Sequence, residues 1–508
     1  MGHEARNAPT YPSKHLLKTL SPTLLPENKN QKYPIYLTNF STKSMKKSLL
    51  IASMALMGAS SAFAVTDGCT YEAKNGLTCN NVWIADRTSN MYGWNDFPFA
   101  QMFAKARTAA LAEIDGKNKV IVGWSKTMEV DGESNDFAHI VVINFETGKT
   151  EKTVQMTCDG APVKGLLCAN QVGCDDFGHV WFAGYVASTY NAETQKFTPL
   201  TIYYVKDMNT GECVKAAELM IPEDETDAVG RIDYCDLNGD VTREKASCTV
   251  MTPLAAPAQK PYVLGWRCEQ GENEWVGAMD DYVSIAMEET YPAGQTTWNL
   301  APMVRIVKSE DYAANLFYVD GFTTYPALYD TSGAMLESFA LAEDLRPDAG
   351  TNGVGEFSFG GRDFIAYSME QYANGGTCRI RVAELGDNQS FEGMESLWVL
   401  PENGLGDVSD GGTRYHAVEA RLYPDANGKQ GVNLLTYKCN NGMGVYGIGE
   451  EGWENPVLSG VNDIVADADA NAPVQYFNLN GVSVDGNNLP AGLYITRQGS
   501  KVNKVVVK

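Results

Sequence analysis

The sequence predicts an all-β protein, a β-propeller of six or seven four-stranded blades followed by a small C-terminal β-sandwich-like tail. Three observations support this fold class. Short strand-like runs alternate with tight turns along most of the chain, long helical periodicity is nearly absent, and one class of glycine turn returns about every sixty residues. We expect the propeller to span residues 65–460.

The first 64 residues are expected to lie outside this propeller. Residues 1–44 are polar and without periodicity, so we interpret them as a non-native extension upstream of the true start. Residues 45–64 have the charged start, apolar middle and small-x-small end (Ala62-Phe63-Ala64) of a signal peptide. The alternative is a membrane anchor, but about 15 apolar residues are short of the about 20 that a bilayer needs. The pattern predicts export through the Sec pathway and a mature chain that begins near Val65.

Charge limits the partners of the mature chain. The whole chain has 40 Lys+Arg and 63 Asp+Glu, and residues 1–64 hold eight and two of these, so the mature net charge is 32 − 61 = −29. Such a field repels nucleic acid and anionic membrane surfaces. No other apolar run is long enough to span a bilayer. We therefore expect no nucleic-acid partner and no transmembrane segment in the mature chain.

The glycine turns define a repeat with gaps of 63, 60, 62, 53 and 63 residues; they are at Gly148, Gly211, Gly271, Gly333, Gly386 and Gly449. Two strand-like runs and an earlier strand precede each turn, and a fourth strand usually follows it. The alternative is a string of unrelated β-sandwiches, but one unit is too small to bury a core alone. Residues 79–94 resemble one more strand and turn, which either closes the last blade or belongs to a degenerate seventh.

Loop length separates the two faces of the propeller. The turns between first and second strands and between third and fourth strands are short and share one face, whereas the other connections are longer and share the opposite face. Binding sites favour long loops on a rigid scaffold, so we expect a ligand site on the long-loop face. Its candidate residues are Tyr190, Trp298, Tyr372, Asp410, Arg414 and His416.

The stretch 406–416 is the best single candidate for this site, because it joins two blades and should enter the channel mouth. Its glycines let the backbone approach a ligand closely. Arg414 and His416 alternate with Tyr415, so on a strand they share a face. The alternative is structural: Arg414 pairs with Asp410, and His416 packs against the neighbouring blade.

Other motifs favour structural roles. Cys174 to Trp181 resembles the Asp-box of sialidases, which is a turn, here expected to be capped by Asp176 with Gly178 left-handed. Residues 236–242 have the oxygen spacing of a calcium loop but lack its glycine and its final acid, and an Asn-Gly hairpin, which explains the same residues, is the favoured interpretation. We expect no metal and no cofactor.

Eleven cysteines follow the signal peptide, and export permits disulfides. Cys235 and Cys248 flank the expected Asn238-Gly239 hairpin turn and are candidates to pair. Cys69 and Cys79 are a second candidate pair. The alternative is that several of these cysteines are small buried hydrophobes.

The acidic stretch 461–473 is interpreted as a linker, and residues 474–508 as a separate β-domain. Tyr476-Phe477-Asn478, Ala491 to Ile495 and the closing Lys504 to Lys508 resemble the C-terminal sorting domain of the Por (type IX) secretion system of Bacteroidetes. The resemblance implies the secretion machinery as a partner and a destination at the outer-membrane surface or outside the cell. The alternative destination is the periplasm.

The chain as a whole is similar to the exported β-propeller proteins of Bacteroidetes. Two functions stay open, since propellers host both. One is a binding or interaction module for glycan or protein that uses the long-loop face. The other is a polysaccharide hydrolase or lyase with acids around the central channel. No catalytic motif such as G-x-S-x-G or H-E-x-x-H is present, which favours the binding module.

Overall fold

The computed structural model describes most of the chain after residue 69. The described residues are 70–87, 91–100, 105–130, 132–191, 193, 196–220, 229–277, 284–286, 290–322, 324–348, 352–370, 378–406, 415–459, 474–477, 483–484, 489–490, 492–498 and 501–507. Within these ranges, no helix has the length and apolar character needed to cross a membrane.

Six sheets form the blades of a propeller, which confirms the predicted fold class and gives six blades in the described residues. Their strands pair antiparallel, except for one parallel pair on the outer edge of blade 2. Blade 1 holds β2 (Ala109–Ile114), β3 (Lys117–Val130), β4 (Glu133–Asn144) and β5 (Thr150–Gln155). Blade 2 holds β8 (Gln171–Cys174), β9 (Val180–Ala183), β12 (Leu200–Asp207) and β13 (Glu212–Leu219), with β6 (Thr157–Cys158) and β7 (Ala161–Pro162) on its outer edge.

The other blades follow in chain order. Blade 3 holds β14 (Arg231–Ile232), β15 (Asp236–Gly239), β16 (Cys248–Ala255), β17 (Tyr262–Cys268), β18 (Val276–Gly277) and β19 (Ser284–Ala286). Blade 4 holds β20 (Met303–Ile306), β21 (Leu316–Gly321), β22 (Thr324–Asp330) and β23 (Met335–Ser338). Blade 5 holds β24 (Val354–Phe359), β25 (Arg362–Ser368), β26 (Ile380–Glu384) and β27 (Glu395–Leu400). Blade 6 holds β28 (His416–Leu422), β29 (Gly431–Lys438), β30 (Gly442–Glu450) and β1 (Leu77–Asp86).

The described residues also form short elements outside the blades. They are the hairpin β10 (Tyr190–Asn191) with β11 (Lys196–Phe197), the 3-10 helices η1 (Met91–Asp96) and η4 (Asp387–Gln389), and the helix α2 (Pro456–Ser459).

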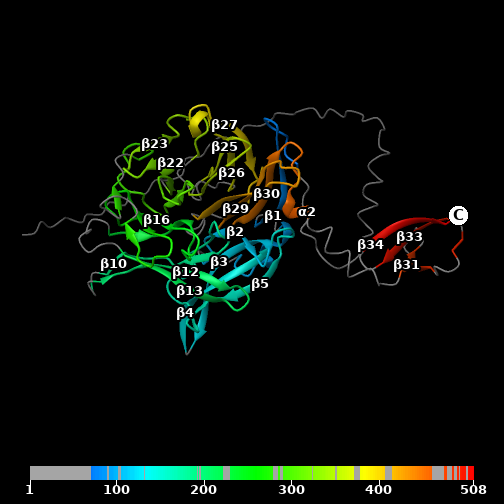
Figure 1. Ribbon diagram of the computed structural model, residues 1–508, viewed down its shortest axis with the longest axis horizontal. Coiled ribbons are helices and arrows are strands. Elements are labelled where there is room, and N and C mark those ends of the chain that lie inside the picture. The colour runs from blue at the N-terminus through cyan, green and yellow to red at the C-terminus, as the bar shows by residue number, and fades with distance from the viewer. Residues whose placement is uncertain are drawn as a thin grey trace, which may run out of the picture. The chain divides into compact units, whose positions relative to one another are not determined.

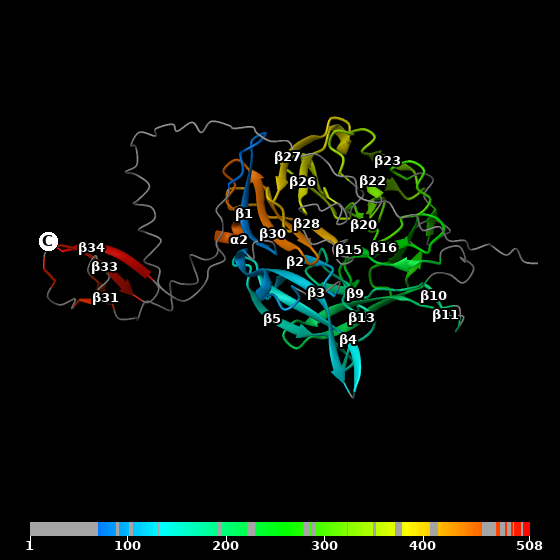
Figure 2. The ribbon, with the colours of Figure 1, turned by 180° about the vertical axis from the view of Figure 1, so that it is seen from behind.

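The first strand of each blade lies at the centre of the propeller. Figures 1 and 2 show the blades around a common centre, and Figure 2 labels the inner strands β2, β15, β20 and β28 there. Apolar clusters fill the space between adjacent blades. Two of the middle strands, β16 (CTVMTPLA) and β29 (GVNLLTYK), are buried along their whole length. Such continuous buried runs are expected where a sheet is covered on both faces.

The N-terminal strand closes the ring. β1 pairs antiparallel with β30, from Leu77 opposite Glu450 to Asp86 opposite Gly442, and Figure 1 shows the blue β1 beside the orange β30. Of the two roles open for residues 79–94, the strand in this segment takes the first, as outer strand of the last blade. Because the two ends of the propeller chain pair in one sheet, the edge of β30 is covered by β1 and is not left exposed.

Two predicted turns are strands instead. Asn238 and Gly239 lie inside β15, with Gly239 opposite Cys248 and the reversal at residues 240–247. Cys235 is therefore not opposite Cys248, and none of the ten described cysteines is in a disulfide bond. Gly449 lies inside β30, because the last blade takes its fourth strand from the N-terminus and needs no turn there.

The C-terminal segment forms its own small sheet. It holds β31 (Val474–Phe477), β32 (Ser483–Val484), β33 (Gly492–Gln498) and β34 (Lys501–Val507), in the order β32-β31-β33-β34. All pairs in this sheet are antiparallel.

Candidate functional site

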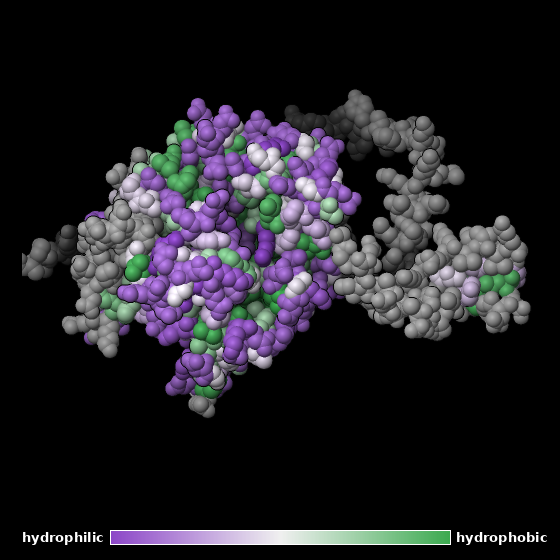
Figure 3. Space-filling model, in the orientation of Figure 1, coloured by the Kyte–Doolittle hydropathy of each residue, from purple (hydrophilic) through white to green (hydrophobic). Residues whose placement is uncertain are grey.

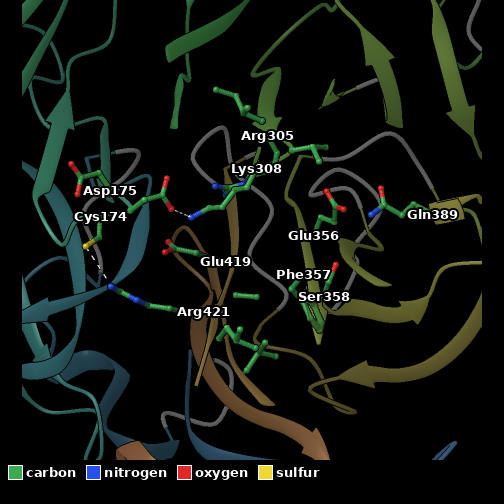
Figure 4. A pocket seen from close by; sticks show the side chains of 16 residues that line it. Cys174, Asp175, Arg305, Lys308, Glu356, Phe357, Ser358, Gln389, Glu419 and Arg421 are labelled. Atoms are coloured by element: carbon green, nitrogen blue, oxygen red, sulfur yellow. Dashed lines mark hydrogen bonds and ion pairs between the residues drawn. The ribbon is translucent and has the colours of Figure 1, made fainter. Parts of the chain in front are cut away.

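A cavity of about 480 Å³ lies where the inner strands of blades 2, 4, 5 and 6 end. Its lining residues are Cys174, Asp175, Asp176, Arg305, Ile306, Val307, Lys308, Glu356, Phe357, Ser358, Gln389, Glu419, Ala420, Arg421, Leu422 and Val432. Figure 4 shows these side chains converging from separate strands. We name this cavity the channel-mouth cavity.

The channel-mouth cavity opens on the short-turn face. Its strand residues come from the carboxyl-terminal part of each inner strand, such as Ser358 in β24 and Arg421 in β28, from which the chain turns into the second strand of the blade. Gln389 comes from η4, in the connection between the third and fourth strands of blade 5. This is the face opposite to the one on which we expected a ligand site. The surface around the propeller is mostly hydrophilic (Figure 3).

Arg305 forms the floor of the cavity. Its guanidinium donates to the Val418 carbonyl at 3.1 Å and the Val354 carbonyl at 3.4 Å, and it contacts Asp236 Oδ1 at 3.3 Å. These partners belong to three other blades, so one side chain joins four inner strands across the channel. Below it, a small cavity of about 40 Å³ is shared by Arg305 and Glu419 with residues of blades 1, 2 and 3.

Two half-buried carboxylates, Glu356 and Glu419, face the channel-mouth cavity from adjacent inner strands. Burial and, to a smaller extent, the nearby Asp363 raise the pKa of Glu356 to about 7. Burial also raises the pKa of Glu419 to about 7, against the lowering effect of Arg305 and Arg421. Among the described residues, neither carboxylate forms a salt bridge within 4.0 Å. Because their pKa values are raised to about 7, both can change protonation state near neutral pH.

Cationic groups complete the wall of the cavity. Arg421 Nη1 donates to Cys174 Sγ at 3.5 Å, from blade 6 to blade 2. Lys308 Nζ pairs with Asp176 at the exposed rim. Figure 4 shows both contacts as dashed lines. The wall thus offers hydrogen-bond donors and acceptors side by side.

The turn that resembles an Asp-box is held by Asp175 rather than Asp176. Asp175 Oδ1 accepts from the backbone N–H of Phe177 at 2.9 Å and of His179 at 2.7 Å, and Gly178 has a φ of +89° as predicted. The prediction that Asp176 caps the turn was wrong, because Asp176 instead accepts from the Gly239 N–H and pairs with Lys308.

Asp175, His179 and Asp240 form the one group of described side chains with metal-ligand spacing. Their donor atoms already have partners, however. Asp175 Oδ2 accepts from the Val241 N–H and His179 Nδ1, both at 2.9 Å, and Asp240 accepts from the backbone of Thr242 and Lys245. The hydrogen bond to Asp175 raises the pKa of His179. We interpret the group as a structural joint between blades 2 and 3.

The opposite end of the channel is filled by a polar cluster. Tyr415 Oη accepts from Arg107 Nη1 at 2.6 Å and donates to Asp233 Oδ1 at 3.1 Å, and all three residues are buried. The Ala301 N–H also donates to Asp233, at 3.1 Å. These residues precede the inner strands of four blades, so the cluster marks the long-loop end. Tyr415 is the last residue before β28 and follows the stretch that we expected to enter the channel mouth.

Three of the residues predicted to bind a ligand are described, and the structure does not bring them together. Trp298 is fully buried in the core of blade 4 and donates from Nε1 to the Tyr262 carbonyl at 2.9 Å. His416 is fully buried between Ser368 Oγ at 2.8 Å and Thr436 Oγ1 at 2.6 Å. Ser368 belongs to blade 5, so His416 packs against the neighbouring blade, which was the structural alternative. Neither residue presents a surface to a ligand in this conformation.

Tyr190 is half-buried in the β10–β11 hairpin, where its ring lies 5.1 Å from the ring of Phe197. Tyr372, Asp410 and Arg414 lie outside the described residues, as do the loop segments 278–283, 287–289, 371–377 and 407–414. A ligand site on the long-loop face therefore stays a prediction.

Sequence reasoning missed Glu356, Glu419, Arg305 and Arg421. One signal was present in the sequence: the two glutamates are 419 − 356 = 63 residues apart, which is the repeat spacing itself. A charged residue at the same position of consecutive first strands must point into the same part of the channel, because the first strands of successive blades are equivalent.

Comparisons with known proteins give distant likenesses only. No protein-family model and no curated protein matches the chain. A solved DUF4623 family protein from Bacteroides eggerthii is 12% identical with a TM-score of 0.44, over 71% of this chain and 74% of that chain. A Penicillium chrysogenum α-L-arabinanase complexed with arabinobiose is 11% identical with a TM-score of 0.40, over 69% and 95%. The GH93 α-L-arabinofuranosidase of Fusarium graminearum is 11% identical with a TM-score of 0.38, over 68% and 92%. Likenesses this distant do not bear on ligand or activity.

Proposed function

We propose that this protein is an exported β-propeller that binds a saccharide in the channel-mouth cavity. The observation that carries the proposal is the pair Glu356 and Glu419, two half-buried carboxylates that face one cavity of about 480 Å³ and have no salt-bridge partner in the described part of the chain. Ligand sites are usually concave, measure about 300–1,000 Å³ and hold a few polar groups that converge on the ligand. The cavity meets each of these conditions.

The chemistry of the wall favours a neutral ligand with many hydroxyl groups. The lining holds three cationic side chains, Arg305, Lys308 and Arg421, against four acidic ones, so no single charge dominates. With a pKa of about 7, Glu356 and Glu419 exist near neutral pH both as carboxylates that accept and as carboxylic acids that donate hydrogen bonds. A sugar hydroxyl both donates and accepts, so it is matched by such a group in either state. Gln389 and Ser358 add neutral polar groups.

Binding is favoured over glycoside hydrolysis by the similarity of the two carboxylates. A glycosidase needs one carboxyl group held protonated as the acid and a second held ionised as base or nucleophile. Here the pKa of both Glu356 and Glu419 is raised to about 7, even though Arg305 and Arg421 act to lower that of Glu419, so neither group is held ionised while the other is held protonated. Hydrolysis or elimination of a polysaccharide is the second candidate, supported by the presence of two acids in the central channel.

The export part of the proposal is supported by the leader pattern of residues 45–64 and by the sorting-type tail. In this account, the C-terminal sheet of residues 474–507 engages the secretion machinery, and the propeller acts at the outer-membrane surface or outside the cell. The periplasm is the alternative location. A protein partner on the long-loop face is the alternative ligand.

A glycan-array screen with the mature chain from residue 65 tests the proposal. We expect at least one saccharide to bind, and Ser358→Trp to abolish that binding, because Ser358 is an exposed residue of the cavity wall and an indole there fills the cavity. Leu336→Trp, at an exposed position of blade 4 away from the cavity, is the matched control. Release of reducing sugar from the bound saccharide would favour the hydrolase instead.

A further inference from the structure

Cys158 and Cys213 face one another on the outer edge of blade 2. The short strand β6 pairs in parallel with β13, and this register places Cys158 directly opposite Cys213. Side chains opposite each other in a sheet lie on the same face. Sequence spacing does not suggest this pair, because the two cysteines are 213 − 158 = 55 residues apart and the first three strands of blade 2 lie between them in the sequence.

The two side chains are close enough for Cys158 to raise the pKa of the Cys213 thiol. Each thiol donates to a neighbouring oxygen: Cys213 Sγ to the Thr157 carbonyl at 3.2 Å and Cys158 Sγ to Asp159 Oδ2 at 3.9 Å. Neighbouring strands lie about 4.8 Å apart, and disulfides bridge Cα atoms about 4.4–6.8 Å apart. The backbone of the pair therefore needs little movement to accommodate a bond between the sulfur atoms.

The two cysteines differ in accessibility. Cys213 is buried, with 2% of its surface exposed, whereas Cys158 is half-buried. Burial raises the pKa of the Cys213 thiol to about 12, so it is a poor thiolate until its neighbour has reacted. An oxidant consequently meets Cys158 first.

We propose that Cys158 and Cys213 form a disulfide bond when the chain enters an oxidising compartment; the proposal rests on the export part of the proposed function. The Cys158 thiolate attacks the disulfide of an oxidant of the thiol–disulfide exchange class and releases one thiolate of that oxidant. Cys213 loses its proton to solvent and attacks Cys158 Sγ in the mixed disulfide, which expels the second thiolate. The protein loses two electrons and two protons, and the oxidant is reduced to two thiols.

The bond would join blades 1 and 2. β6 follows β5, the last strand of blade 1, after one residue, and β13 is the last strand of blade 2. The bond would close a loop that contains β8, β9 and β12, so the blade could not leave the ring without also displacing the end of blade 1. A crosslink of this kind restricts the unfolded chain and raises stability.

The chain offers an internal comparison. Cys248 and Cys268 are also directly opposite, on β16 and β17. Both are fully buried, whereas Cys158 is half-buried, so an oxidant does not reach either sulfur of this pair; Cys268 Sγ donates to the Glu272 carbonyl at 3.4 Å. We expect this pair to stay reduced under conditions that oxidise Cys158 and Cys213.

The experiment is a peptide map of the folded mature chain after incubation with glutathione disulfide and alkylation of the remaining thiols. Trypsin releases Cys158 in residues 153–164 and Cys213 in residues 207–215, each with no other cysteine. We expect these two peptides to be linked without reductant and separate after reduction. Recovery of both as alkylated peptides from oxidised folded protein would overturn the proposal, as would linkage of either one to another cysteine.

A stability measurement keeps the test independent of saccharide binding. The parent chain should unfold at a higher urea concentration when oxidised than when reduced. Cys158→Ser should remove that redox dependence, whereas Cys268→Ser should keep it. An unchanged redox dependence in Cys158→Ser would assign the effect to other cysteines and contradict the proposal. A saccharide-binding failure with an intact disulfide would refute the ligand assignment alone.

Discussion

Trp83 is the side chain on which closure of the propeller depends most directly. It lies in the closing strand β1, is 1% exposed, and donates from Nε1 to the Phe145 carbonyl of blade 1 at 2.6 Å. Gly148 packs on the same indole so closely that a Cβ at this position would lie 2.8 Å from Cδ2. The indole thus fills the junction between the two blades at which the ends of the propeller meet.

The effect of Trp83→Ala can be worked from these contacts. Truncation of a buried Trp to Ala costs about 3–5 kcal/mol, and loss of the donor to the Phe145 carbonyl adds about 1 kcal/mol. We expect the free energy of unfolding to fall by about 4–6 kcal/mol. Trp83→Phe keeps most of the volume and loses the hydrogen bond, so its expected cost is about 1–3 kcal/mol.

Equilibrium urea unfolding of the chain from residue 65, followed by far-UV circular dichroism, measures both variants. Leu336→Ala is the control, because Leu336 is 45% exposed in blade 4 and exposed substitutions stay within about 0.5 kcal/mol. If Trp83→Ala lowered the free energy of unfolding by less than about 1 kcal/mol, the argument that β1 closes the ring would be refuted.

Three further predictions concern titration, processing and location. In the folded chain the pKa of Glu356 and of Glu419 is raised from the ordinary 4.5 to about 7, so between these pH values the folded chain binds more protons than the unfolded chain. The free energy of unfolding should therefore fall as pH rises through this range, and the urea midpoint of a variant with both residues changed to Gln should fall less. Cleavage after Ala64 predicts that Edman sequencing of exported protein begins at residue 65, and residues upstream of Met45 in that protein would exclude it. Deletion of 474–508 should leave the thermal midpoint of the propeller unchanged but move the protein to another cell fraction of the native host, and an unchanged fractionation would remove the sorting role.

The repeat made the propeller predictable because each blade needs the same four strands and the same turns. Where the ring closes, that rule breaks, which is why Gly449 was taken for a turn although it lies in β30. The prediction of a turn at Asn238-Gly239 is wrong for a different reason. These two residues pair with β16 in the sheet, and this tertiary pairing overrides the local preference of Asn-Gly for a turn.

The candidate site was harder to predict because it is assembled from residues far apart in sequence. Long loops with aromatic and charged residues pointed to one face, yet the described cavity lies on the other, where side chains of the inner strands converge. Residue type alone does not predict whether a side chain is exposed. Trp298 has an aromatic face of the kind that stacks on sugars, but it is buried in the core of blade 4. Glu356 and Glu419 line one cavity because the closed ring places the inner strands β24 and β28 next to each other.

The most direct test of the central claim is a binding titration at the channel-mouth cavity. The saccharide that binds best on the array is titrated calorimetrically into the parent chain, into Ser358→Trp and into the control Leu336→Trp, with all three shown to be folded. The account predicts that only Ser358→Trp loses measurable heat of binding. Equal binding by all three proteins would contradict it and return the search for the ligand site to the long-loop face.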